Sequence, residues 1–91
     1  MYKFCYSARF KKDFKKISKN PNFKPKELER VFGVLLGGGT LSAKYQSHKL
    51  AGEFEGCLEC HVRPDILLIY SVDKEALVIS LLRIGSHSDL F

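Results

Sequence analysis

The stretch GCLECHVRPDILLIY, residues 56–70, decides the fold of this chain of 91 residues. Its first half alternates like a β-strand, with Leu58, Cys60 and Val62 on one side and Cys57, Glu59, His61 and Arg63 on the other. Pro64-Asp65 interrupts the pattern and indicates a turn or bulge. Residues 66–70 are apolar throughout, as expected of a strand covered on both faces. The stretch therefore predicts two neighbouring antiparallel strands.

A third strand extends this pair toward the C-terminus. Residues 72–75 predict the next turn and residues 76–84 the next strand, after which Gly85 is expected to release the chain into the segment 86–91. These three strands form a meander.

Two helices are predicted before the meander. A short strand over residues 2–6 leads into a helix capped by Ser7, whose apolar residues recur at i, i+4 and i+7: Phe10, Phe14 and Ile17. Residues 20–22 break this helix, and Pro25 opens a second one that runs to about Leu36. The predicted order is β-α-α-β-β-β in one domain, residues 1–91. The class is α+β, a small and mostly antiparallel sheet with the helical hairpin on one face.

A glycine triplet, Gly37-Gly38-Gly39, follows the second helix. It lacks the GxxxxGK[ST] pattern and does not join a strand to a helix, so it predicts a helix end and a flexible turn rather than a phosphate-binding loop. Residues 40–52 are then expected to form a long connection containing His48, and such loops often carry function.

Composition indicates an ordered globule. Hydrophobic residues make up 45% of the chain, and no apolar run approaches the roughly 20 residues that cross a bilayer. Residues 1–6 lack the apolar stretch of a signal peptide. We therefore expect a cytoplasmic protein without membrane contacts.

Charge is distributed unevenly. Residues 1–49 contain 12 Lys and Arg against 3 Asp and Glu, a net charge of +9, whereas residues 50–91 contain 3 against 7, a net charge of −4. A basic half favours a polyanionic partner such as nucleic acid, although a solvated helical surface explains the charge equally well.

Three cysteines are an odd number, which argues against a disulfide framework. Cys57 and Cys60 spell CxxC, but on a strand positions i and i+3 point to opposite faces. A zinc site would need further ligands from Cys5 or the histidines. Ordinary buried or half-buried cysteines are the favoured interpretation, so no metal or cofactor is expected.

Acid–base residues gather in the second half of the chain: His48, His61, Asp65, Arg83 and His87. Cleavage of RNA without a metal needs a base for the 2′-hydroxyl, a cation for the charged transition state and an acid for the leaving oxygen. Histidine suits either proton role, and arginine suits the charge role. A terminal aromatic, Phe91, could stack on an exposed base.

Each of these residues also has a structural interpretation. His61 and Asp65 could form a polar pair at a strand end, Arg83 could form a salt bridge with Asp65 or Glu59, and Phe91 could fill the core. Spacing alone thus leaves a ribonuclease and a metal-binding module both open.

Three ordered blocks carry a more specific signal: residues 48–52 (HKLAG), residues 59–70 (ECHVRPDILLIY) and residues 82–91 (LRIGSHSDLF). They resemble the YafQ branch of the RelE/ParE toxin superfamily. The resemblance implies a toxin of a type II toxin–antitoxin system, a ribosome-dependent endoribonuclease that cleaves mRNA in the A site and is silenced by a cognate antitoxin.

Carried over by position, the resemblance implies a catalytic set of His48, His61, Asp65, Arg83, His87 and Phe91. His87 resembles the general acid, Asp65 with His48 or His61 would act as or support the base, and Arg83 would hold the scissile phosphate. Basic residues expected to contact RNA are Lys11, Lys12, Lys15, Lys16, Lys49 and Arg63.

Two positions depart from the family pattern. Members often carry an arginine where Leu58 stands and an aromatic residue where Ile66 stands. Losing the cation is expected to weaken phosphate binding or shift substrate preference. The alternatives on the same fold are a non-enzymatic inhibitor of the gyrase-poisoning type and a plain RNA-binding module.

Overall fold

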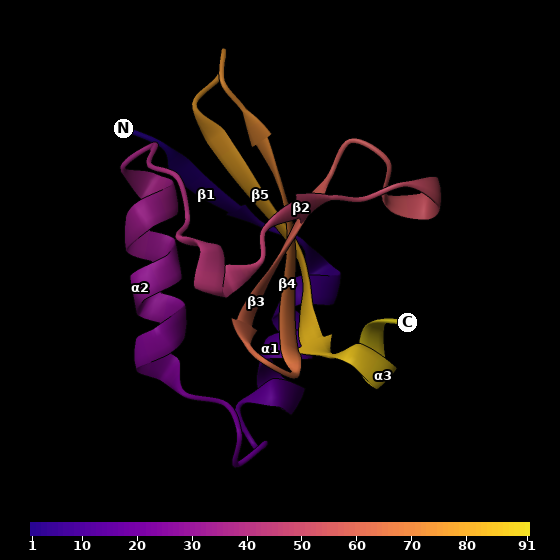
Figure 1. Cartoon of the computed structure of the whole chain (residues 1–91). Coiled ribbons are helices and arrows are strands. Elements are labelled where there is room, and N and C mark those ends of the chain that lie inside the picture. Colours follow the sequence, from indigo (N-terminus) through magenta and orange to yellow (C-terminus); the bar gives the residue numbers. More distant parts are fainter.

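A computed structural model describes all 91 residues and contains one five-stranded sheet in the order β1-β5-β4-β3-β2. The strands are β1 (Lys3–Tyr6), β2 (His48–Lys49), β3 (Leu58–Arg63), β4 (Ile66–Asp73) and β5 (Val78–Ser86). The helices are α1 (Ala8–Ile17), α2 (Pro25–Leu36) and a final turn α3 (His87–Leu90) (Figure 1). Only β1 runs parallel to its neighbour, β5, so the predicted α+β class and its mostly antiparallel sheet are confirmed.

Both long helices begin where the sequence indicates. The Ser7 hydroxyl caps α1 by accepting a hydrogen bond from the Phe10 amide at 2.9 Å, and Pro25 occupies the first turn of α2. Gly37 ends α2, and Gly38 adopts a φ of 74° beside the ring of Tyr2, a conformation that glycine adopts without strain. The glycine triplet is therefore a helix end and turn, as predicted.

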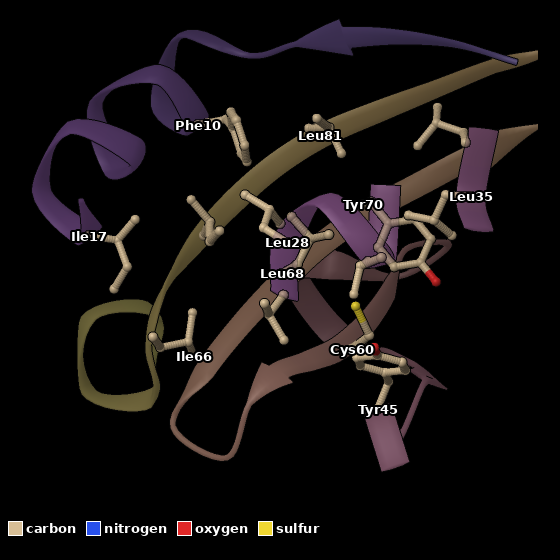
Figure 2. Close-up of a cluster of buried hydrophobic side chains, with 14 of the residues drawn as sticks. Phe10, Ile17, Leu28, Leu35, Tyr45, Cys60, Ile66, Leu68, Tyr70 and Leu81 are labelled. Atoms are coloured by element: carbon tan, nitrogen blue, oxygen red, sulfur yellow. The ribbon is translucent and has the colours of Figure 1, made fainter. Parts of the chain in front are cut away.

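One main core lies between the helices and one face of the sheet (Figure 2). The helices contribute Phe10, Ile17, Leu28, Val31 and Leu35. The sheet contributes alternate residues of β3 and β4 and, on both sides of a register shift, three residues of β5: Ile79, Leu81 and Ile84. Phe14, expected in the apolar stripe, is instead 38% exposed and packs edge-on against Phe23 at a centroid distance of 5.9 Å. None of the helices combines the length and the apolar character that a bilayer-spanning segment needs.

The other face of the sheet carries a smaller apolar cluster, so it is not left bare. Leu67 and Ile69 of β4 are fully buried there with Leu90 of α3, and Leu50 and Phe54 pack against them. This explains why residues 66–70 are apolar at every position: β4 is covered from both sides.

The structure corrects two predictions. Residues 40–52 are not a plain connection, because they contain the 3₁₀ turn η1 (Ala43–Tyr45), the strand β2 and the start of a second turn, η2 (Gly52–Phe54). Gly85 does not release the chain, because β5 continues to Ser86. Gly85 is needed for close packing: a Cβ there would lie 3.3 Å from the Cβ of Asp89 in α3.

Candidate functional site

His48 and His61 meet on neighbouring strands at one edge of the sheet. The two-residue strand β2 sets His48 opposite Glu59 of β3, and His48 Nε2 lies 3.2 Å from Glu59 Oε1. The His48 Nδ1 atom lies 3.0 Å from the Gln46 carbonyl oxygen, so each of the two ring nitrogens has a polar partner. The ring centroids of His48 and His61 are 6.4 Å apart. The buried Glu59 carboxylate therefore orients an exposed imidazole.

Strand register decides which of the other residues share this face. Residues directly opposite on adjacent antiparallel strands point the same way, and Glu59 is opposite Ile69, which is opposite Arg83. In the next row His61 is opposite Leu67, which is opposite Gly85. Two strand spacings amount to about 10 Å. The predicted residues thus form two groups separated by β4: His48 and His61 lie on β2 and β3, and Arg83 and the α3 residues lie on and after β5.

His87 and Phe91 lie in and just after α3, beside the end of β5 (Figure 1). Their rings are 5.4 Å apart, and Phe54 packs edge-on against Phe91 at 6.2 Å. Phe91 is 60% exposed, so it does not fill the core. A capping box holds the turn: the Ser86 hydroxyl accepts a hydrogen bond from the Asp89 amide, and the Asp89 carboxylate accepts one from the Ser86 amide.

Arg83 is bound by a residue that sequence reasoning did not select. Its Nε and Nη2 donate to the Asp13 carboxylate of α1 at 2.6 and 3.1 Å, and the Ile84 amide donates to the same group at 3.2 Å. The predicted partners Asp65 and Glu59 are not used. Because the guanidinium donates hydrogen bonds to Asp13, the pKa of Arg83 is raised further above its ordinary value.

Asp65 is exposed in the turn between β3 and β4. The adjacent residue Ile66 is opposite Ser86, so Asp65 and His87 lie at the same end of the sheet. Ile66 itself is 1% exposed and belongs to the main core, as does the half-buried Leu58 at its margin. The two positions that depart from the family pattern therefore pack on the helix side, away from the His61 face.

The basic residues expected to contact RNA differ in exposure and in their partners. Lys11, Lys12 and Lys15 are exposed on α1, and Lys49 is exposed on β2. Lys16 instead donates to Asp89 at 2.9 Å and thereby links α1 to α3. This hydrogen bond, with that of Ser86, lowers the pKa of Asp89. Arg63 is half-buried at the end of β3.

The CxxC pair points to opposite faces, as predicted. Cys60 lies in the main core, whereas Cys57 packs against the smaller cluster. Burial, with a smaller contribution from the charge of Glu59, raises the pKa of the Cys60 thiol to about 12. Because the two thiols lie on opposite faces of the sheet, Cys57, Cys60 and His61 do not converge on one point that a metal ion could occupy. No group of three His, Cys, Asp or Glu side chains is arranged to hold a metal ion.

Sequence reasoning missed Glu59 as the partner of His48, and it missed Asp13 and Phe54 as neighbours of Arg83 and Phe91. A carboxylate two positions before His61, on the same strand face, is a signal for Glu59, and the Ser86-x-x-Asp89 spacing is a signal for the cap of α3. Nothing in the sequence links Asp13 to Arg83, which lies 70 positions away.

Comparison with known proteins gives one consistent result. Residues 2–91 match the family model of the bacterial toxin of type II toxin–antitoxin systems, YafQ. The chain is 33% identical over 87 residues to the mRNA interferase toxin YafQ of Escherichia coli K12, covering 94% of this chain and 91% of that one. It is similar to a metal-bound toxin from Helicobacter pylori, with a TM-score of 0.89, 41% identity and full coverage of both chains. It is also similar to YafQ in the E. coli DinJ–YafQ complex, with a TM-score of 0.87, 29% identity and coverage of 100% and 99%. The chain therefore belongs to the YafQ family, the bacterial toxins of type II toxin–antitoxin systems.

Proposed function

We propose that this toxin is an mRNA interferase that cleaves its message in the ribosomal A site by acid–base catalysis on the 2′-hydroxyl. Its curated relative in E. coli is named an mRNA interferase toxin, and the two chains align over most of their length. The products would be a 2′,3′-cyclic phosphate and a 5′-hydroxyl. The reaction would be metal-independent, because the chain itself offers an acid, a base and a fixed cation.

The observation that carries this proposal is the two-sided arrangement of proton-transfer residues on one face of the sheet. His61 and Gly85, which lies two residues before His87, are two strand spacings apart across β4, about 10 Å. A phosphodiester between the His48–His61 group and His87 would have a base on one side and an acid on the other, each about 3 Å from the oxygen it serves. In this scheme His87 is the acid, and His48 or His61, with Asp65, supplies the base.

Arg83 would stabilise the charge that develops on the phosphate. Asp13 occupies its Nε and one terminal nitrogen, which leaves the second terminal nitrogen free to donate to a phosphate oxygen. Because the guanidinium is already oriented by Asp13, less freedom is lost when the substrate binds. Phe91, exposed beside His87, would stack on a neighbouring base.

Two macromolecular partners follow from this function. The exposed lysines of α1 would contact ribosomal RNA through phosphates, so binding should weaken as salt rises. The E. coli relative has been crystallised with the antitoxin DinJ. We expect a cognate antitoxin for this chain as well.

The proposal is tested by translating a reporter message with purified ribosomes and mapping the cleaved ends. His87→Ala and Asp65→Ala should each slow cleavage by about 10²–10⁴-fold. Lys74→Ala is the control, because Lys74 is exposed in the turn at the far end of β5 from α3. A message with a 2′-deoxy sugar at the cut nucleotide should stay intact.

Cleavage and growth arrest by both variants at the parental rate would refute the catalytic assignment. Toxicity of the parent with intact mRNA would instead indicate an inhibitor of another target.

A further inference from the structure

A pocket of about 340 Å³ lies beside His61, at the edge of the sheet. Its walls come from three segments: Glu27 of α2, Lys44 and Tyr45 of η1, and His61 and Arg63 of β3. The volume falls within the range of about 300–1,000 Å³ that small-ligand sites occupy, although only two of the eight lining residues are hydrophobic. A polar pocket of this kind suits a charged group.

The short length of β2 leaves this edge of the sheet open. β2 pairs only with Leu58 and Glu59, so β3 has no strand neighbour on that side beyond Glu59. A register shift between His61 and Arg63 also distorts the ladder with β4. The end of β3 therefore presents its side chains to the pocket rather than to another strand.

Two buried side-chain nitrogens in the molecule have no hydrogen-bond partner, and both belong to residues of this pocket. They are His61 Nδ1 and Arg63 Nε. Buried polar groups are nearly always paired, so unpaired ones need an explanation. Arg63 Nε is a donor, and His61 Nδ1 is a donor whenever it carries the proton. Their coincidence points to a ligand that accepts hydrogen bonds.

The charges around the pocket favour an anion. Arg30 and Arg83 are paired with carboxylates, but half-buried Arg63 is in no salt bridge. The wall does contain one carboxylate, Glu27, which accepts from Tyr45 at 3.0 Å and from Lys44 at 3.4 Å. These bonds, that of Tyr45 first, lower the pKa of Glu27. Arg30 donates to the same carboxylate at 3.3 Å, so Glu27 has three donors of its own, whereas Arg63 has no carboxylate partner.

We infer that this pocket binds a phosphate of the RNA strand on the side of the cut bond where His48 and His61 lie. A guanidinium binds phosphate through two parallel donors, and Lys44, whose side chain is 61% exposed, can add a third contact at the rim. The identification of the ligand as RNA rests on the proposed function, because His61 belongs both to the pocket and to the proposed cleavage site. An RNA strand held at His61 would therefore lie beside this pocket.

The test measures binding apart from cleavage. A fluorescent single-stranded RNA of about 12 nucleotides, fully 2′-O-methylated so that it cannot be cut, is titrated with the full chain at several salt concentrations. Arg63→Gln should weaken binding on the order of tenfold and reduce the slope of log K against log salt by about 0.7. Arg63→Lys should recover only part of the loss, and Lys44→Gln should cause a smaller one.

Lys3→Gln is the matched control, because Lys3 is an exposed cation on β1, at the opposite edge of the sheet. The Arg63 Nε–H signal in a ¹⁵N spectrum should also shift when the RNA is added. Equal affinities for Arg63→Gln and Lys3→Gln, or an unmoved Nε–H signal, would overturn the proposal. Unchanged RNA binding with weaker binding of a poly-glutamate peptide would assign the pocket to an acidic peptide and likewise overturn it.

These outcomes are separable from the proposed function. If the parent binds the RNA through Arg63 but never cuts mRNA on ribosomes, the phosphate pocket is supported and the ribonuclease function is refuted. If the parent cuts mRNA and Arg63→Gln binds and cuts equally well, the ribonuclease function is supported and the phosphate pocket is refuted.

Discussion

Replacing Asp13 with alanine should destabilise the whole domain, because this carboxylate joins the first helix to the last strand. It accepts three hydrogen bonds, two from Arg83 and one from the Ile84 amide. The side chains of Arg83 and Asp13 are 15% and 16% exposed, so Asp13→Ala would leave a largely buried guanidinium without its counter-charge.

The expected loss follows from this geometry. Breaking a buried ion pair by removing one partner costs about 3–5 kcal/mol. The residual exposure of both groups favours the lower end, and alanine recovers about 0.6 kcal/mol of helix propensity over aspartate. The net loss should be about 2–3 kcal/mol, a large fraction of the roughly 5–14 kcal/mol expected for a domain of this size.

Urea denaturation followed by circular dichroism measures the effect. With a slope of about 1–3 kcal/mol per molar urea, a loss of about 2–3 kcal/mol should lower the midpoint by roughly 0.7–3 M. Lys12→Ala, next to Asp13 on the exposed side of α1, is the control and should change the stability by less than about 0.5 kcal/mol. In a double-mutant cycle, Asp13→Ala and Arg83→Ala should couple by at least about 1 kcal/mol. Additive losses, or a loss below about 1 kcal/mol for Asp13→Ala, would refute the reasoning.

Three further predictions concern the C-terminal turn and the thiols. The pKa of Asp89 is lowered in the folded state, so its contribution to stability is present above its unfolded pKa and lost as the pH falls through the folded value. The α3 turn should therefore fray in acid, below about pH 4. The protection factors of the α3 amide hydrogens, which correct for the pH dependence of exchange itself, should then fall; unchanged protection factors down to about pH 2 would contradict this. Cys60 should resist alkylation at pH 8 until the protein unfolds, whereas exposed Cys5 reacts at once; mass spectrometry counts the labels, and early labelling of Cys60 would disprove its burial. Gly85→Ala should push α3 outward by a few tenths of an ångström and slow cleavage while the fold persists, because His87 moves with the turn. Parental kinetics in that variant would show that the close contact does not position His87.

Patterns within single elements were readable from the sequence. The alternation over residues 56–63 gave the correct faces for Cys60 and His61, and the glycine triplet marked the end of α2. These features depend on residues a few positions apart, whose geometry the local backbone fixes. The candidate site residues were also selected from the sequence, as acid–base and aromatic residues of its second half; the resemblance then implied their individual roles, which remain predictions.

The tertiary structure decided how those elements meet. A two-residue strand has too little sequence pattern to be recognised, yet β2 is what sets His48 against Glu59. The pairing of Asp13 with Arg83 and of Lys16 with Asp89 depends on how α1 crosses β5, which no local pattern encodes. The open edge that leaves Arg63 beside a pocket exists because β2 begins only at His48, so no residue before it pairs with β3 beyond Glu59. Periodicity therefore determined the elements and their faces, whereas strand register and helix packing, which join residues distant in the chain, decided which side chains share a site.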